Sequence, residues 1–361
     1  MEKEKRKITE NSTNLNIYLG TYNGAIIKTK YTLKQENEKE EKKNKSNKAF
    51  SFKASENMIK TIFPYEDEFI FTSGTDEIIR IFNTKNNEEK GVILSYSGSV
   101  SKLNIFKNYI IAMCDTNIEF FKLKNFNKVN TLKGHKFSII NFIVHSTGKL
   151  MFSIGRDNYL MMWNLNNYKC SFKYKFDGVE LVSLNWMKNE SLVCLGFVNK
   201  ILILDYLKES EDFNEWKVVE YRIKSSFQNP GKILDVRIVR NKVFIFKTNF
   251  QVEVLSLKEN AEGEKVDYTV NYYKLSDEEN TKEEENEPRR LKFVEIAIKE
   301  NEKNEFLVTV NSKNEIFVYS LFDFTTKNEG NTENEEFKLV KSIKKIDLMV
   351  DRFTTLALAY E

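Results

Sequence analysis

The stretch LKGHKFSIINFIVHSTGKLMFSIGRDNYLMMWN, residues 132–164, decides the fold of this chain. It holds three short apolar runs, each about 5–7 residues long and rich in Ile, Phe and Met, with polar breaks between them. Asp157 lies in the second break, where a tight hairpin turn favours Asp, Asn or Gly, and Trp163 follows six residues later. The pattern predicts short strands joined by hairpins.

The same unit recurs along the chain at a nearly fixed spacing. Its turn residue stands at positions 76, 115, 157 and 199, so the successive steps are 39, 42 and 42 residues. A period of about 40–45 residues with four strands per unit is typical of a propeller blade. Six residues after each turn residue come Phe82, Phe121, Trp163 and Asp205.

Three further turns complete the count. Asn249 and Lys313 fit at wider spacing if polar, acidic insertions are allowed, and a YNG turn is centred on Asn23. Strands near 15–20, 25–31 and 48–53 precede the first full blade, and the chain ends with a single strand near 352–359. Three strands plus one make a seventh blade, which closes the ring and removes the exposed sheet edge. We therefore expect an all-β, single seven-bladed β-propeller closed by its two chain ends.

The domain organisation follows from this count. Residues 1–14 form a charged N-terminal arm, and residues 15–361 form the propeller. The arm holds Lys3, Lys5, Arg6 and Lys7, which suit RNA phosphates, although nearby glutamates favour a solvated terminus instead. Polar composition predicts flexible insertions at about 34–47, 207–216, 257–267, 275–289 and 325–335.

Composition excludes several classes of protein. The chain has 361 residues, a formal net charge of +3, 13 Gly and 3 Pro, which describes a globular protein without Gly-rich loops. Two His and three Cys, with no C-x-x-C pair, leave little for a metal site, a disulfide framework or a His-based catalytic centre. Because the charged N-terminus lacks an apolar stretch, we expect no secretory signal, and no run of about 20 apolar residues occurs in the sequence. We expect no cofactor, no metal, no small-molecule substrate and no membrane span.

The quoted stretch resembles a WD repeat, with Gly134-His135 near its start and Trp163-Asn164 near its end. His135, Ser153, Asp157 and Trp163 match the four-residue hydrogen-bond network of that repeat. Ser, His and Asp together also suit a hydrolase, but no G-x-S-x-G motif is present. Since Asp157 lies in a turn and His135 in the loop entering the first strand, the four residues are predicted to be structural.

The match extends beyond a generic WD repeat. NEEKGVILSYSGSV after the first blade, HSTGKLMFSIGRDNYLMMWNL in the third, and the N-terminal IYLGTYNGAIIKTKY are similar to the WD-repeat family of p21-activated-kinase-interacting proteins. The yeast member of that family is a large-ribosomal-subunit assembly factor. The resemblance covers roughly residues 15–206. Tyr96 stands where a His is expected, and the basic C-terminal tail common in the family is absent.

The resemblance implies a non-catalytic scaffold in large-subunit (pre-60S) assembly, found in the nucleus and nucleolus. Its partners would be assembly factors, ribosomal proteins and rRNA, with the chain a monomer inside a larger complex. A regulator that binds a p21-activated protein kinase, or a generic WD-repeat interaction scaffold, stays open as an alternative.

Five basic residues are the candidate contacts for RNA or an acidic partner. Loops that enter the first strand of a blade share a face with the turns between strands two and three. This places Lys133, Lys136 and Arg156 on one rim, and the repeat register adds Lys175 and Lys247. A basic face suits phosphate or carboxylate groups. A plain lysine-rich surface is the competing interpretation.

Overall fold

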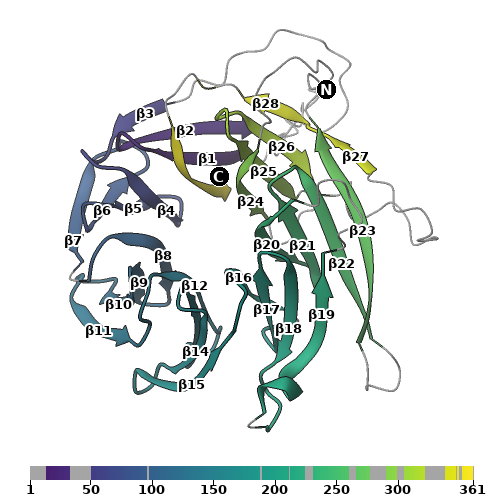
Figure 1. Ribbon diagram of the computed structural model, residues 1–361. Helices are drawn as coiled ribbons and strands as arrows, with labels where there is room; N and C mark the ends of the chain where they lie inside the picture. The colour runs from purple at the N-terminus through teal and green to yellow at the C-terminus, as the bar shows by residue number, and fades with distance from the viewer. Residues whose placement is uncertain are drawn as a thin grey trace, which may run out of the picture.

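The computed structural model is a ring of seven blades, each an antiparallel sheet of four strands, with a fifth strand added to one of them (Figure 1). The predicted seven-bladed propeller is thereby confirmed. The structure describes residues 14–32, 50–95, 97–187, 189–210, 212–223, 231–259, 266–276, 290–298, 305–321, 338–346, 348 and 352–360. The predicted arm, apart from Asn14, and the predicted insertions 34–47 and 325–335 lie outside these residues, as does most of 275–289.

Blades one to four each use four strands that are consecutive in the chain, the first being the innermost. They are β4 (Ile59–Tyr65), β5 (Phe69–Gly74), β6 (Ile78–Asn83) and β7 (Glu89–Leu94) in blade one; β8 (Val100–Phe106), β9 (Tyr109–Cys114), β10 (Asn117–Lys122) and β11 (Lys128–Lys133) in blade two; β12 (Ile139–Val144), β13 (Leu150–Gly155), β14 (Tyr159–Asn164) and β15 (Lys169–Lys175) in blade three; and β16 (Leu181–Met187), β17 (Leu192–Phe197), β18 (Lys200–Asp205) and β19 (Lys217–Arg222) in blade four.

One strand, β27 (Lys338–Lys341), connects blades five and six and is called the strap below; the sequence did not predict it. Blade five holds β20 (Ile233–Val239), β21 (Lys242–Lys247), β22 (Gln251–Glu259) and β23 (Val266–Ser276), and blade six holds β24 (Leu291–Ala297), β25 (Phe306–Asn311), β26 (Ile316–Ser320) and β28 (Lys344–Ile346). Between β26 and β28 the chain crosses to blade five, where β27 pairs parallel with β23. The ends of the predicted insertion 257–267 lie in β22 and β23.

The seventh blade closes the ring as predicted. Its order is β29 (Phe353–Tyr360), β1 (Asn14–Thr21), β2 (Ala25–Thr32) and β3 (Phe50–Lys53), so strands from the two ends of the chain pair directly (Figure 1). Leu15 pairs with Tyr360 and Leu19 with Leu356 in the antiparallel register. Strand β29 is the innermost strand and lines the central channel together with the first strands of the other six blades.

All seven predicted turns connect the second and third strands of a blade. In six blades the first turn residue donates its backbone N–H to the carbonyl of the residue just before the innermost strand. These pairs are Tyr22 with Arg352, Thr75 with Met58, Arg156 with Ser138, Val198 with Glu180, Thr248 with Lys232, and Ser312 with Arg290. The bond fixes each turn beside the loop that enters its blade. The face that carries these turns and loops is called the turn face below.

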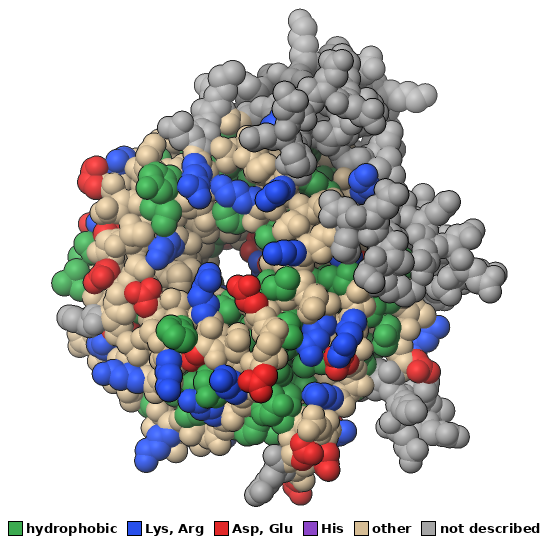
Figure 2. All heavy atoms as spheres, viewed as in Figure 1, with side chains coloured by type: hydrophobic (Ala, Val, Ile, Leu, Met, Phe, Trp, Pro, Cys, Tyr) green, Lys and Arg blue, Asp and Glu red, His purple; other side chains and the backbone are tan. Residues whose placement is uncertain are grey.

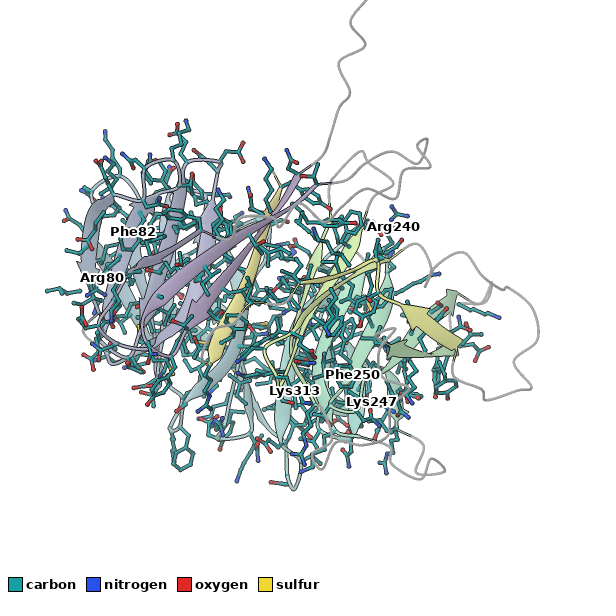
Figure 3. The ribbon with its side chains drawn as sticks, turned by 90° about the horizontal axis from the view of Figure 1, so that it is seen from above. Arg80, Phe82, Arg240, Lys247, Phe250 and Lys313 are labelled. Carbon is teal, nitrogen blue, oxygen red and sulfur yellow. The ribbon has the colours of Figure 1, made fainter. Side chains whose placement is uncertain are left out.

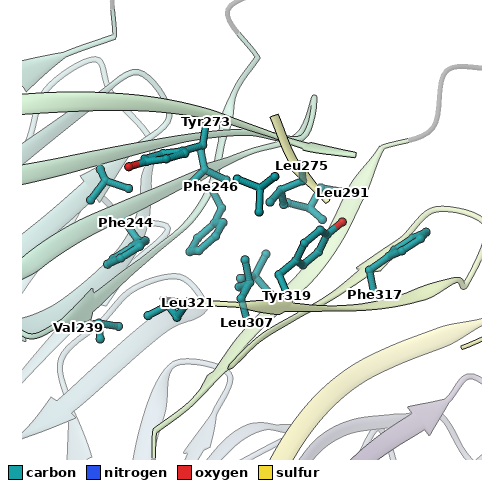
Figure 4. Close-up of a cluster of buried hydrophobic side chains, with 14 residues drawn as sticks. Val239, Phe244, Phe246, Tyr273, Leu275, Leu291, Leu307, Phe317, Tyr319 and Leu321 are labelled. Atoms are coloured by element: carbon teal, nitrogen blue, oxygen red, sulfur yellow. The ribbon is translucent and has the colours of Figure 1, made fainter. Parts of the chain in front are cut away.

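The core lies between neighbouring blades rather than at one centre. Middle strands such as β17 and β25 are buried along their whole length, and their sequences are accordingly mostly apolar. Figure 4 shows one such layer, where Phe244 and Phe246 of blade five meet Leu307 and Tyr319 of blade six. Fully burying each of these side chains contributes about 1.5–3 kcal/mol.

Part of the predicted flexible insertion 207–216 packs on the ring. A short 3-10 helix, η1 (Phe213–Trp216), begins where the Asp212 carboxylate accepts the backbone N–H of Asn214. Phe213 and Trp216 are buried, and Trp216 stacks on Phe172 of β15 with ring centroids 4.5 Å apart. The insertion therefore bridges the outer strands of blades three and four. The two aromatic residues of this insertion indicate that it packs, whereas its charged residues alone predicted a flexible segment.

Candidate functional site

The four WD-network residues of blade three are joined in one chain of hydrogen bonds. The Trp163 indole N–H donates to Ser153 Oγ at 2.8 Å, and Ser153 Oγ lies 2.7 Å from His135 Nε2. His135 Nδ1 lies 3.0 Å from Asp157 Oδ1. Because the Ser153 oxygen accepts from Trp163, its own proton is directed to His135 Nε2. The His135 Nδ1–H then donates to Asp157, and the imidazole is neutral.

The electrostatics of the network agree with a neutral histidine. Burial lowers the pKa of His135, and the neighbouring Asp157 only partly offsets this. Burial alone would raise the pKa of Asp157, but hydrogen bonds from His135 and from the Lys136 and Tyr159 backbone N–H groups lower it. The Ser153 side chain is fully buried and bonded on both sides. This arrangement clasps strand β13 to the entering loop and presents no nucleophile to a substrate.

Other blades use different polar ties at the same place. In blade one, Ser55 donates to the Asp76 carboxylate at 2.9 Å, and Arg80 pairs with the same carboxylate. In blade two, the fully buried Glu119 accepts from Ser97 at 2.7 Å and pairs with Lys128. Phe82 and Phe121 stand where blade three has Trp163, and both are buried. Tyr96 lies outside the described residues.

Four of the five candidate contacts lie together on the turn face. Lys133 ends the outermost strand of blade two, Lys136 lies in the following loop, Arg156 lies in the turn of blade three, and Lys175 ends its outermost strand. All four are exposed. Phe137, 62% exposed, lies next to Lys136 in the same loop. The Lys136 backbone N–H donates to Asp157 at 2.8 Å, so the WD network holds this loop in place.

The prediction that Lys247, the fifth candidate, is a contact residue is wrong. Figure 3, a side view, shows Arg240 at one face and Lys247, Phe250 and Lys313 towards the opposite, turn face. The Lys247 side chain is nevertheless fully buried and pairs with Glu253, which is also fully buried. The Tyr221 hydroxyl donates to the same Glu253 carboxylate at 2.8 Å. Lys247 is the last residue of the second strand of blade five, the position that Gly155 occupies in blade three. Its side chain points into the sheet rather than outward.

The central channel is the second candidate site. Its volume is about 800 Å³, and the innermost strands of all seven blades line it. Figure 2 shows the central opening with Lys, Arg and acidic side chains around it. An innermost strand is a sheet edge, so its backbone carbonyls need partners from elsewhere. Each innermost strand carries a β-bulge near its start, as at Ile59/Thr61 and Val100/Lys102.

Side chains of these strands reach the next blade and form what we call the inner belt. Lys102 donates to the Phe142 carbonyl, Asn141 to Leu184, Asn185 to Val236, and Arg237 to Val294, at 2.8–3.2 Å. Lys292 donates to the Phe353 carbonyl, Thr354 to that of Ile59, and Lys60 to the Ser99 hydroxyl at 2.7 Å. These bonds cross all seven junctions between blades. The belt fixes the innermost strands relative to one another.

Two acidic side chains of the channel wall are bound to one arginine. Arg237 Nη1 lies 3.1 Å from Glu295 Oε1, and Arg237 Nε lies 2.8 Å from Asp235 Oδ2. Lys102 pairs with no acid within the described part of the chain. Burial lowers its pKa to about 8, and the charge of Arg237 adds to that effect, although Asp235 and Glu295 oppose it. The described residues of the channel wall therefore carry positive charge that they do not neutralise themselves.

Among the described residues, no group of three or more His, Cys, Asp or Glu side chains could hold a metal ion. No helix in that same part of the chain has the length and hydropathy of a membrane-spanning segment. The sequence did not indicate the channel lysines and Arg237. They can be recognised only when the innermost strands of the blades are aligned. Lys60 and Lys292 then occupy the second position of their strands, Lys102 the third and Arg237 the fifth.

The seven-bladed ring and the hydrogen-bonded group His135, Ser153, Asp157 and Trp163, called the clasp below, define the class of this protein. It is a seven-bladed WD-repeat β-propeller. A chain in the crystal structure of the mitotic checkpoint complex has a similar fold, with a TM-score of 0.61 over 85% of this chain and 83% of that one. The two are 10% identical, so this likeness shows the fold alone. No family model matches the sequence.

Three curated relatives carry a particular description, p21-activated protein kinase-interacting protein 1-like. The Xenopus laevis protein is 28% identical over 114 residues, which is 31% of each chain. The Danio rerio protein is 29% identical over 108 residues and the Gallus gallus protein 26% over 107, each match covering 29% of both chains. The resemblance found in the sequence is thereby confirmed. It spans less than a third of the length of these relatives.

Proposed function

We propose that this protein is a non-catalytic scaffold in the assembly of the large ribosomal subunit. It acts in the nucleus and nucleolus, as one copy within a pre-60S particle. The similarity to p21-activated-kinase-interacting protein 1-like proteins supports this proposal, because the family that the sequence resembles has a yeast member that assembles the large ribosomal subunit. The ring supplies a rigid platform, and its turn face supplies the binding groups.

The exposed groups of the turn face suit such a particle. Lys133, Lys136, Arg156 and Lys175 offer positive charge to rRNA phosphates or to an acidic protein segment. Phe137 adds an exposed ring that can stack on a base or fill an apolar pocket. Because the chain has a net charge of only +3, binding depends on this local patch rather than on bulk charge.

Affinity purification of the tagged protein, followed by protein identification and RNA sequencing, tests the proposal. We expect pre-60S assembly factors, large-subunit ribosomal proteins and precursor rRNA to be recovered. Recovery of small-subunit precursors alone, or of no ribosomal component, would contradict it.

The name shared by the relatives favours a second function, regulation of a p21-activated protein kinase. The same purification separates the two, because this function predicts a kinase among the recovered proteins and no precursor rRNA. A source organism without such a kinase would eliminate this alternative.

A further inference from the structure

The channel opens on the turn face beneath blade seven, in a pocket of about 350 Å³. This opening, called the turn-face mouth, is lined by residues from blades one, two, six and seven and the loops that enter them. They include Tyr22, Met58, Lys60, Lys292, Phe293 and Arg352. Lys60, Lys292 and Phe293 also line the channel below, so the mouth and the channel are continuous.

The mouth is positively charged, and within the described part of the chain no acidic residue lines it. Lys60, Lys292 and Arg352 contribute three cations, and none of them forms an ion pair with a described residue. Lys60 gives one hydrogen bond to Ser99, and Lys292 gives one to the Phe353 carbonyl. An ammonium group has three N–H donors. Counting only bonds to described residues, two donors on each lysine are available to a ligand.

The surrounding charges strengthen the attraction for an anion. Among the residues that the structure describes, the mouth and channel together carry five cationic side chains, Lys60, Lys102, Arg237, Lys292 and Arg352, and two acidic ones, Asp235 and Glu295. Both acids are held by Arg237. Burial lowers the pKa of Lys292, and the charge of Arg352 lowers it further. A bound anion would relieve that repulsion, and a narrow opening walled by protein concentrates the field.

The mouth also offers apolar surface beside its cations. Tyr22 is 54% exposed, and the Arg352 guanidinium lies over its ring, 5.9 Å from the ring centroid. Met58 and Phe293 line the same pocket. Carboxylate groups suit the cations, and an aliphatic or aromatic neighbour suits the ring. An extended peptide supplies both on one of its faces, through alternate side chains. A pocket of this volume admits a few side chains, whereas a nucleic-acid strand needs a longer basic groove.

We propose that the turn-face mouth binds an acidic segment of a partner protein. Its Asp or Glu carboxylates contact Lys60, Lys292 and Arg352, and a neighbouring side chain packs on Tyr22. This site is separate from the patch around Lys133, and it does not depend on the ribosomal role. It makes the turn face bivalent, with one patch for phosphate or acidic groups and one mouth for a peptide.

The test uses the full chain and a fluorescein-labelled ten-residue peptide rich in Asp and Glu, followed by fluorescence anisotropy. We expect binding that weakens with salt and falls at least about tenfold in the double variant Lys60→Glu, Arg352→Glu. The matched control is Lys122→Glu, Lys124→Glu, which changes the net charge equally on the opposite face and should keep affinity within about twofold. Circular dichroism melting checks that each variant is folded.

Arg352 is exposed, so Arg352→Glu alone provides the same test if the Lys60 change prevents folding. Equal loss in the mouth and control variants would mean that only general charge matters and would overturn the proposal. A fluorescein-labelled oligouridine of the same length serves as the rival ligand. Tighter binding of that RNA than of the peptide, lost in the mouth variants, would also overturn it.

Discussion

One register position shows how the repeat accepts different side chains. The third residue of the third strand is Arg80, Glu119, Met161 and Glu253 in blades one, two, three and five, each opposite the fourth residue of the second strand. Each charged version has an ion-pair partner, as Glu253 has Lys247. A buried charge is tolerated only when it is paired and hydrogen bonded, so the partner is as necessary as the charge.

The first prediction follows from that pair. Lys247→Met should lower the free energy of unfolding by about 3–5 kcal/mol, because it leaves the Glu253 carboxylate buried without a counter-ion. Adding Glu253→Gln should recover most of the loss, since the amide oxygen still accepts from the Tyr221 hydroxyl. Urea unfolding of the two variants and the wild type measures this. A single variant as stable as the wild type would place Lys247 at the surface.

The second prediction concerns the clasp in blade three. Trp163→Ala should cost about 3–5 kcal/mol because it truncates a buried aromatic side chain. Asp157→Ala should cost about 1–3 kcal/mol, since the His135 N–H loses its acceptor. Urea unfolding at pH 7 checks both. A folded Asp157→Ala protein that had lost a hydrolase activity would refute the structural assignment.

The third prediction uses the charge in the channel. The pKa of Lys102 is about 8 in the fold and 10.5 as a free side chain. Between these pH values the unfolded chain binds more protons than the folded chain, so the free energy of unfolding should rise with pH. Lys102→Met should remove that rise. The measurement is the difference between wild type and variant at pH 7.5 and pH 10; a difference independent of pH would be inconsistent with a depressed pKa.

At the scale of elements, the stability of the ring depends on the pairing of the two chain ends in blade seven. Strand β29 pairs with β1 and also takes part in two junctions of the inner belt, through the Phe353 carbonyl and the Thr354 side chain. The fourth prediction is that deleting residues 352–361 exposes the inner edge of blade seven and destabilises the whole molecule, not that blade alone. Loss of one cooperative urea transition, with binding of a hydrophobic dye, would show this. An unchanged transition midpoint would mean that the ring does not need the C-terminal strand.

The sequence predicted the elements that repeat and missed those that do not. All seven turns were predictable because each needs a polar residue between two buried strands, as at Asp157 and Asn249. The three-plus-one closure followed from counting. The strap β27 pairs with β23 across a stretch that leaves blade six and returns, and no local pattern specifies such a long-range pairing. The burial of Lys247 was missed because a lysine at a strand end normally reaches solvent.

At the scale of the whole molecule, the turn face combines the features that a binding scaffold needs. The loop cations around blade three are exposed, while the clasp beneath them is rigid. The fifth prediction is that Lys133→Glu, Lys136→Glu and Arg156→Glu together release the protein from pre-ribosomes without unfolding it, because all three lie at strand ends or in loops. Binding of isolated protein to RNA should be weak and should fall steeply with salt. Retention of the triple variant on the particle would exclude this patch as a contact.

The most direct test of the account is sedimentation of cell extract through a sucrose gradient, with detection of this protein in each fraction. If it is a large-subunit assembly factor, it should co-sediment with large-subunit precursors, and its depletion should lower large subunits relative to small ones. A purely free pool, with normal subunit ratios after depletion, would contradict the assembly role and favour the kinase-regulator alternative.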